Sequence, residues 1–120
     1  MDKKSIERTY AKTLLELGIR PNIKGYYYLL EGLTRVHTEP EIVYSMMKKF
    51  YTLLAESQDN ANIQQVERAI RHAISIAENA STPLWCKLFS DGQRPSNSLF
   101  LAMIRETIRL KLREEGDKVG

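Results

Sequence analysis

Apolar residues recur every three or four positions along most of this chain, and no segment alternates apolar and polar residues as a half-buried strand does. Because an α-helix turns once in 3.6 residues, this spacing collects the apolar side chains of each segment on one face. The pattern predicts an all-α fold of six helices joined by short connections. The expected ranges are 5–17, 24–36, 38–57, 62–77, a short helix from 81 to about 89, and 96–114.

The length and composition of the chain indicate one domain. Its 120 residues can bury one hydrophobic core but not two, and 42% of them are hydrophobic, as in folded proteins. We therefore expect a single domain over residues 1–120, with frayed ends at about 1–4 and 116–120. No run approaches the roughly 20 apolar residues of a membrane span, and the first residues lack the apolar segment of a secretory signal.

Three of the predicted helix starts carry residues that cap helices well. These are Thr38 with Glu41, Asn62 with Gln65, and Ser81 or Thr82 before Pro83. The polar segment QDNAN, residues 58–62, separates the helix over 38–57 from the helix that follows it. We expect it to form a short turn.

No arrangement of residues typical of an enzyme or a metal site is visible. The single cysteine, Cys86, lies in the apolar segment PLWCKLF, which favours a buried and unreactive thiol. His37 and His72 are far apart, and no Cys/His cluster has the spacing of zinc ligands. A glycine-rich phosphate loop is also missing. We expect no enzymatic activity, no cofactor and no metal.

Two features permit a nucleic-acid partner without requiring one. The net charge is +3 and the sequence pI is about 9.0, which is compatible with a polyanion. Residues 26–30, YYYLL, can be interpreted as a platform for stacked bases. Tyrosines at helical spacing more often fill a core and direct the hydroxyl group to its rim, and we favour that interpretation.

The helix over 62–77 has two distinct faces when each residue is advanced by 100°. The inward face comprises Ile63, Val66, Ile70, Ala73, Ile74 and Ala77. The outward face comprises Gln64, Glu67, Arg68, Arg71 and Ser75, with Gln65 and His72 at its edge. A Glu67–Arg71 pair would contribute only a few tenths of a kcal/mol. We therefore do not expect acidic partners to neutralise the arginines.

The outward face carries the side chains that read base edges. Arginine binds O6 and N7 of guanine, glutamine pairs with adenine, and glutamate accepts a hydrogen bond from the cytosine amino group. A helix, a short turn and a polar-faced helix also follow one another in the order of a helix-turn-helix. Many helical domains have two such helices, so a plain solvated face is the alternative.

Three segments resemble the C-terminal DNA-binding effector domain of stage zero sporulation protein A, the sporulation response regulator of endospore-forming bacteria. They occur in the family's order: NIKGYYYL at 22–29, VERAIRHAI at 66–74 and RPSNSLFLAM at 94–103. The middle segment matches without a gap. The resemblance extends from about residue 13 to about residue 112.

The resemblance implies a six-helix domain with a central helix-turn-helix that regulates transcription in the cytoplasm, at the nucleoid. Such domains bind double-stranded DNA as head-to-tail pairs on tandem boxes. Carried over by position, the base contacts are Glu67, Arg68 and Arg71, joined by Gln64 from the same face. The expected DNA backbone contacts are Asn62, Gln65, His72 and Ser75. Residues 85–94 would contact RNA polymerase sigma factor.

The sequence also departs from the family. No receiver domain precedes the effector domain, so we expect either a stand-alone paralogue or a part of a longer protein. Gln64 and Gln65 stand where a small polar and a basic residue are usual. The helix over 38–57 lacks the family's proline and paired lysines. These changes remove positive charge near DNA and predict weaker binding. The alternative function is a protein-interaction module that pairs with a full-length regulator or antagonises it.

Overall fold

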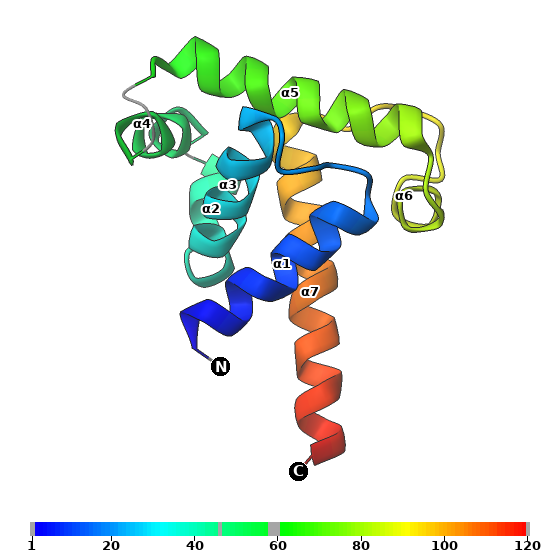
Figure 1. The fold of residues 1–120 in the computed structure, drawn as a ribbon. Helices are drawn as coiled ribbons and strands as arrows, with labels where there is room; N and C mark the ends of the chain where they lie inside the picture. The colour runs from blue at the N-terminus through cyan, green and yellow to red at the C-terminus, as the bar shows by residue number, and fades with distance from the viewer. Residues whose placement is uncertain (1, 46, 58–60, 120) are drawn as a thin grey trace.

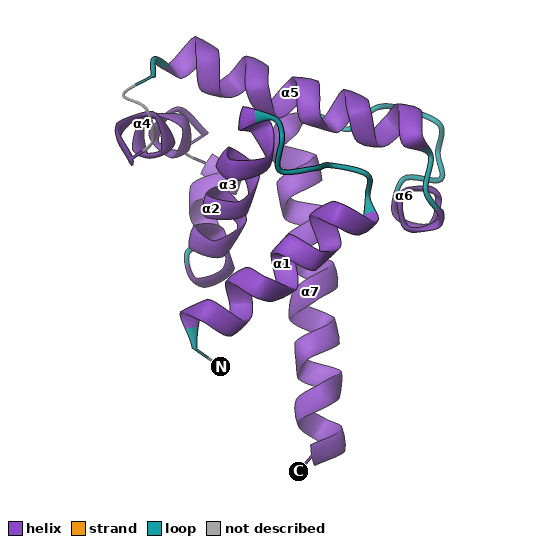
Figure 2. Cartoon of the chain, in the orientation of Figure 1, coloured by secondary structure: helices purple, strands orange, loops and turns teal. Residues whose placement is uncertain are grey.

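The computed structural model describes residues 2–45, 47–57 and 61–119, and every regular element in these ranges is an α-helix (Figures 1 and 2). The described helices are α1 (Lys3–Glu16), α2 (Lys24–Thr38), α3 (Glu41–Ser45), α4 (Met47–Ser57), α5 (Ile63–Ala80), α6 (Pro83–Leu88) and α7 (Asn97–Val119). The predicted all-α class is confirmed. None of these helices has both the length and the apolar character needed to cross a bilayer.

The predicted helix over 38–57 is described as two helices, α3 and α4. The described part of the chain therefore has seven helices, and the predicted number of six is wrong. Met46, between α3 and α4, lies outside the described residues, as do residues 58–60 of the expected turn. The two helices have different neighbours, because α3 packs against α2 and α7, and α4 packs against α2 and α5. Tertiary contacts of this kind outweigh local helix propensity.

Helix α2 is the centre of the fold, since it packs against α1, α3, α4, α5 and α7. Figure 1 shows α5 lying across one end of the molecule, with α6 beside its C-terminal end. The C-terminal part of α7 extends from the opposite end of the molecule (Figure 1). Helices α1, α4 and α7 each contribute a large, fully buried side chain to the core: Tyr10, Phe50 and Phe100.

Two of the three predicted caps are confirmed. The Asn62 side chain accepts from the backbone N–H of Gln65 at 2.8 Å, and the Gln65 side chain accepts from the N–H of Asn62 at 2.9 Å. Thr82 caps α6, whose first residue is Pro83. The predicted cap at Thr38 is wrong, because Thr38 is the last residue of α2 and its hydroxyl donates to the carbonyl of Arg35 at 3.2 Å. A proline two residues later prevents α2 from continuing.

Several helix ends extend beyond their predicted limits. Helix α1 begins at Lys3, α5 continues to Ala80 and α7 continues to Val119. The predicted start of the last helix near Ser96 or Asn97 is confirmed, and the Ser96 hydroxyl accepts from the N–H of Leu99 at 3.2 Å.

Two predictions of burial need correction. Tyr26 and Tyr28 are buried as expected, but Tyr27 is 47% exposed, because three consecutive helical residues cannot share one face. Cys86 is exposed, so the prediction of a buried thiol is wrong. In the short helix α6 the Trp85 side chain faces the core, and its ring centroid lies 4.5 Å from that of Phe89. Cys86, the next residue, therefore faces solvent.

A polar cluster joins α1, α2 and α7 inside the domain. A 2.6 Å hydrogen bond links the Tyr10 hydroxyl to Nδ1 of His37, and Nη2 of Arg105 donates to the backbone carbonyl of His37 at 3.1 Å. Burial, aided by the positive charge of Arg105, lowers the pKa of His37 below its ordinary value of 6.5. Burial raises the pKa of the Tyr10 hydroxyl. Both shifts favour the uncharged forms of the two side chains that share this hydrogen bond.

Candidate nucleic-acid interface

Helix α5 has one buried face and one solvent face. Val66, Ile70, Ala73, Ile74 and Ala77 are buried, which confirms the predicted inward face apart from Ile63, which is partly exposed. Asn62 and Gln65 form the capping box at the start of this helix. Burial of this continuous apolar stripe fixes the orientation of α5 about its own axis. This orientation determines which side chains face outward.

Gly25 allows α2 to approach α5 closely. A Cβ atom at position 25 would lie 2.4 Å from the carbonyl oxygen of Ala69 and 2.8 Å from Cβ of Ala73, whereas real Cβ contacts essentially never fall below 3.0 Å. Both neighbours belong to α5, and one of them is backbone that cannot rotate away. The glycine in the NIKGYYYL segment therefore positions α5 on the core.

The outward face of α5 is open to solvent as predicted. Gln64, Arg68 and Arg71 are exposed, and Glu67 and Ser75 are partly exposed. The predicted backbone contacts at the edge of this face, Asn62, Gln65 and His72, are exposed as well. Helix α7 packs against α5 without burying any of these side chains.

Arg71 and Glu67 are paired, which corrects the expectation that neither arginine is neutralised. Nη2 of Arg71 donates to Oε1 of Glu67 across one helical turn. The Arg71 and Glu67 side chains remain 56% and 39% exposed, so the pair contributes at most about 0.5 kcal/mol. Arg68 has no ion-pair partner anywhere in the described part of the chain.

The capping box uses only part of the hydrogen-bonding capacity of Asn62 and Gln65. The carbonyl oxygen of each side chain is occupied by a backbone N–H. The amide NH₂ group of each side chain is a separate donor, and both residues are exposed. These two residues therefore stabilise the start of α5 and still offer donors beside it.

Asn97 ties α5 to α4 and α7, a role that sequence reasoning missed. Its Nδ2 donates to the Tyr51 hydroxyl at 3.0 Å and to the backbone carbonyl of Glu67 at 3.3 Å. Burial raises the pKa of Tyr51, which therefore keeps its proton. Asn97 belongs to RPSNSLFLAM, one of the three segments that resemble the family. That resemblance was the only sequence signal for a role of Asn97.

Arg94, from the same segment, holds the other end of α5. Its Nε and Nη2 both donate to Oε1 of Glu78, at 2.9 Å and 2.7 Å. Both side chains are partly exposed, so this pair contributes little energy. It does link the connection before α7 to the last turns of α5.

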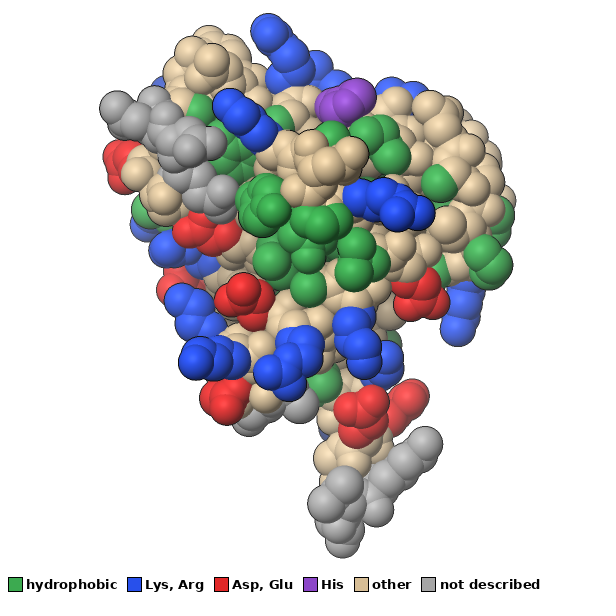
Figure 3. All heavy atoms as spheres, in the orientation of Figure 1, with side chains coloured by type: hydrophobic (Ala, Val, Ile, Leu, Met, Phe, Trp, Pro, Cys, Tyr) green, Lys and Arg blue, Asp and Glu red, His purple; other side chains and the backbone are tan. Residues whose placement is uncertain are grey.

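The charges are unevenly distributed over the surface. Figure 3 shows Lys, Arg and His side chains along the upper edge of the molecule, over α5, whereas the Asp and Glu side chains of this face lie lower or at the left edge. A basic edge beside an exposed helix favours a polyanionic partner. Among the described residues no group of three or more His, Cys, Asp or Glu can hold a metal ion.

A comparison with known protein families agrees with this geometry. Residues 10–108 match the family described as sporulation initiation factor Spo0A C terminal. The matched region includes the Gly25 contact, the outward face of α5 and the Asn97 contacts, and it covers most of the chain. The chain therefore belongs to this family of C-terminal, DNA-binding effector domains of sporulation transcription regulators.

Proposed function

We propose that this domain recognises a short DNA box through the major groove, with α4 and α5 as a helix-turn-helix and α5 as the recognition helix. The observation that supports this most strongly is Arg68. It is exposed on the outward face of α5 and has no ion-pair partner among the described residues. An arginine that is free of acids keeps all five of its N–H donors for a guanine edge.

We propose that four side chains contact bases: Gln64, Glu67, Arg68 and Arg71. Arginines at positions 68 and 71 suit guanines, Gln64 suits adenine, and Glu67 suits the cytosine amino group. Helices α4 and α5 pack against each other. Figure 1 shows α4 nearly end-on while α5 runs across the view, so the two helices cross. Crossed consecutive helices are typical of a helix-turn-helix.

We propose that Asn62, Gln65, His72 and Ser75 position α5 through the DNA backbone. The free amide donors of Asn62 and Gln65 lie at the start of α5, where the helix dipole also favours a phosphate. Such contacts carry no sequence information, but they fix how the helix lies in the groove.

The proposal can be tested in two steps. Selection from random duplex DNA with the wild-type domain identifies the box, and titration of labelled box and scrambled duplexes then measures affinity. Arg68→Ala and Arg71→Ala are each expected to weaken box binding by about 1–3 kcal/mol and to relax preference at a single base pair. The control is Arg113→Ala, because Arg113 is an exposed arginine on the last turns of α7. Equal binding by the wild type and both α5 variants would contradict the proposal.

We further propose that residues 85–94 contact RNA polymerase sigma factor and that two domains bind tandem boxes head to tail. Lys87 is exposed on α6, so Lys87→Glu should reduce transcription activation and leave box binding intact. Tandem boxes should bind more tightly than two isolated boxes do. Unchanged activation by Lys87→Glu would refute the proposed sigma-factor contact. Independent binding of two domains to tandem boxes would refute the proposed head-to-tail pair.

The alternative function, a protein-interaction module, makes a different prediction. Such a module would capture a full-length regulator in the absence of DNA. Capture that occurs only on DNA would exclude this alternative.

A further inference from the structure

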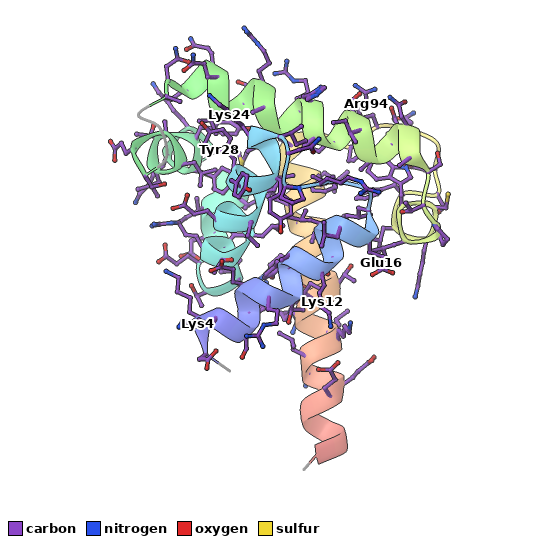
Figure 4. The ribbon with its side chains drawn as sticks, viewed as in Figure 1. Lys4, Lys12, Glu16, Lys24, Tyr28 and Arg94 are labelled. Carbon is purple, nitrogen blue, oxygen red and sulfur yellow. The ribbon has the colours of Figure 1, made fainter. Side chains whose placement is uncertain are left out.

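A hollow lies between the start of α2 and the flank of α5. Its volume is about 340 Å³, and its lining includes Lys24 and Tyr28 from α2 and Gln65, Arg68 and His72 from α5. Figure 4 shows Lys24 and Tyr28 just below the N-terminal half of α5, on the side of α4. Lys24 and His72 are exposed, so their polar ends are accessible from solvent.

The charge of this hollow distinguishes it from the other two hollows along α5. One of those lies between α4 and α5 and is lined by Glu56 and Glu67 as well as Lys48. The other lies beside the start of α7 and also contains Glu67. None of the described residues that line the hollow at Lys24 is acidic. Among the described lining residues, an anion therefore meets a carboxylate in the first two hollows, but meets donors and cations without a carboxylate in the third.

The dimensions of a DNA groove explain why an anion would reach this hollow. An α-helix with its side chains is about 10–12 Å across, and the major groove is about 12 Å wide, so a recognition helix fills the groove. The phosphates on the rims of the groove must then contact whatever flanks the helix. On this side of α5 the flanking element is the start of α2, which carries Lys24.

We propose that this hollow binds one phosphodiester of the DNA backbone, with Lys24 as its principal cation. Gln65 and His72 donate to the same phosphate from α5, Tyr28 forms the wall, and Arg68 points to the bases at the edge of the hollow. This inference rests on the proposed function and adds to it a residue outside the helix-turn-helix. It also explains how the domain binds DNA with uncharged residues at positions 64 and 65.

Salt dependence separates a phosphate contact from a base contact. Each neutralised phosphate contributes about 0.9 to the slope of log K against log salt concentration. If the contact contributes nothing at 1 M salt, Lys24→Gln weakens binding about 15-fold at 50 mM salt and about fourfold at 200 mM salt. Because a phosphate carries no sequence information, the factor should be the same for the selected box and for a scrambled duplex.

The experiment titrates both duplexes at several salt concentrations with the wild type, Lys24→Gln, Lys24→Arg and Lys12→Gln. Lys12 is an exposed lysine of α1, well away from α5 (Figure 4), so Lys12→Gln changes the net charge equally and should bind like the wild type. Lys24→Arg keeps the positive charge and should retain most of the affinity. Thermal unfolding of each variant verifies that the fold is intact.

The outcomes are distinct. If the wild type binds the box, and Lys24→Gln matches Lys12→Gln in affinity and in the slope of log K against log salt concentration, the phosphate site is overturned. The proposed function would still stand in that case. A loss confined to the selected box, with an altered base preference, would also overturn it, because Lys24 would then read a base. A wild type that binds neither duplex at 50 mM salt would refute the proposed function together with this inference.

Discussion

Replacement of Gly25 tests whether the close approach of α2 positions α5. A Cβ atom at this position would lie 2.4 Å from the backbone carbonyl oxygen of Ala69 and 2.8 Å from Cβ of Ala73. Overpacking of this kind costs about 1–3 kcal/mol. Replacing glycine by alanine inside a helix stabilises the helix by at most about 1 kcal/mol. The stabilisation is smaller at position 25, which is the second residue of α2. The net loss expected for Gly25→Ala is about 1–2 kcal/mol of unfolding free energy.

The assay is chemical and thermal unfolding of Gly25→Ala beside a matched glycine variant. For a domain of this size, 1–2 kcal/mol corresponds to a fall in Tm of about 4–10 °C. Gly116→Ala is the control, because Gly116 also lies in a helix and a Cβ atom there would meet nothing within 4 Å. This control should be as stable as the wild type or slightly more stable.

Both variants gain helix propensity, but only Gly25→Ala introduces a clash. If Gly25→Ala is as stable as Gly116→Ala, then α2 and α5 can separate at no cost. The reasoning that the glycine fixes the position of α5 would then be wrong.

Three further changes test other parts of the structure. Asn97→Ala removes two hydrogen bonds that join α4, α5 and α7, so it should lower the unfolding free energy by about 1–3 kcal/mol, whereas Asn79→Ala, at an exposed position of α5, should have little effect. Asn62→Ala removes half of the capping box and should lower stability by about 1 kcal/mol in urea unfolding; no loss would show that the cap is dispensable. The pKa of His37 is lowered in the folded state, so the unfolded chain binds its proton first, and stability should fall as pH drops below about 6.5. His37→Gln should weaken this dependence and His72→Gln should keep it; identical pH profiles for both would contradict the assignment.

The features of α5 that follow from local physics could be predicted from the sequence. The 3.6-residue period of Val66, Ile70 and Ala73 reports the buried face, and the cap formed by Asn62 and Gln65 depends on residues only three positions apart. Because these interactions lie within one helix, no knowledge of the tertiary fold was needed to identify them.

Features that depend on distant residues could not be predicted in this way. Asn97 bonds to Tyr51 and to the carbonyl of Glu67, which lie 46 and 30 positions away in the sequence. The requirement for glycine at position 25 likewise arises from α5, not from α2 itself. Helices α3 and α4 of the 38–57 segment likewise pack against different distant elements, α7 and α5 respectively. A helical period carries information about one face, but not about which element covers it.

The pair formed by Glu67 and Arg71 is compatible with the proposed reading of bases and sharpens it. Its exposure limits its contribution to about 0.5 kcal/mol, whereas a bidentate arginine–guanine contact discriminates by about 1–3 kcal/mol. A site that offers guanine to Arg71 and a cytosine amino group to Glu67 therefore replaces the pair at a net gain. A site that lacks them leaves Arg71 bound to Glu67 and brings a carboxylate toward the phosphates. Under this proposal, Glu67 lowers affinity for arbitrary sequences more than for the matching box, which is the difference that defines specificity.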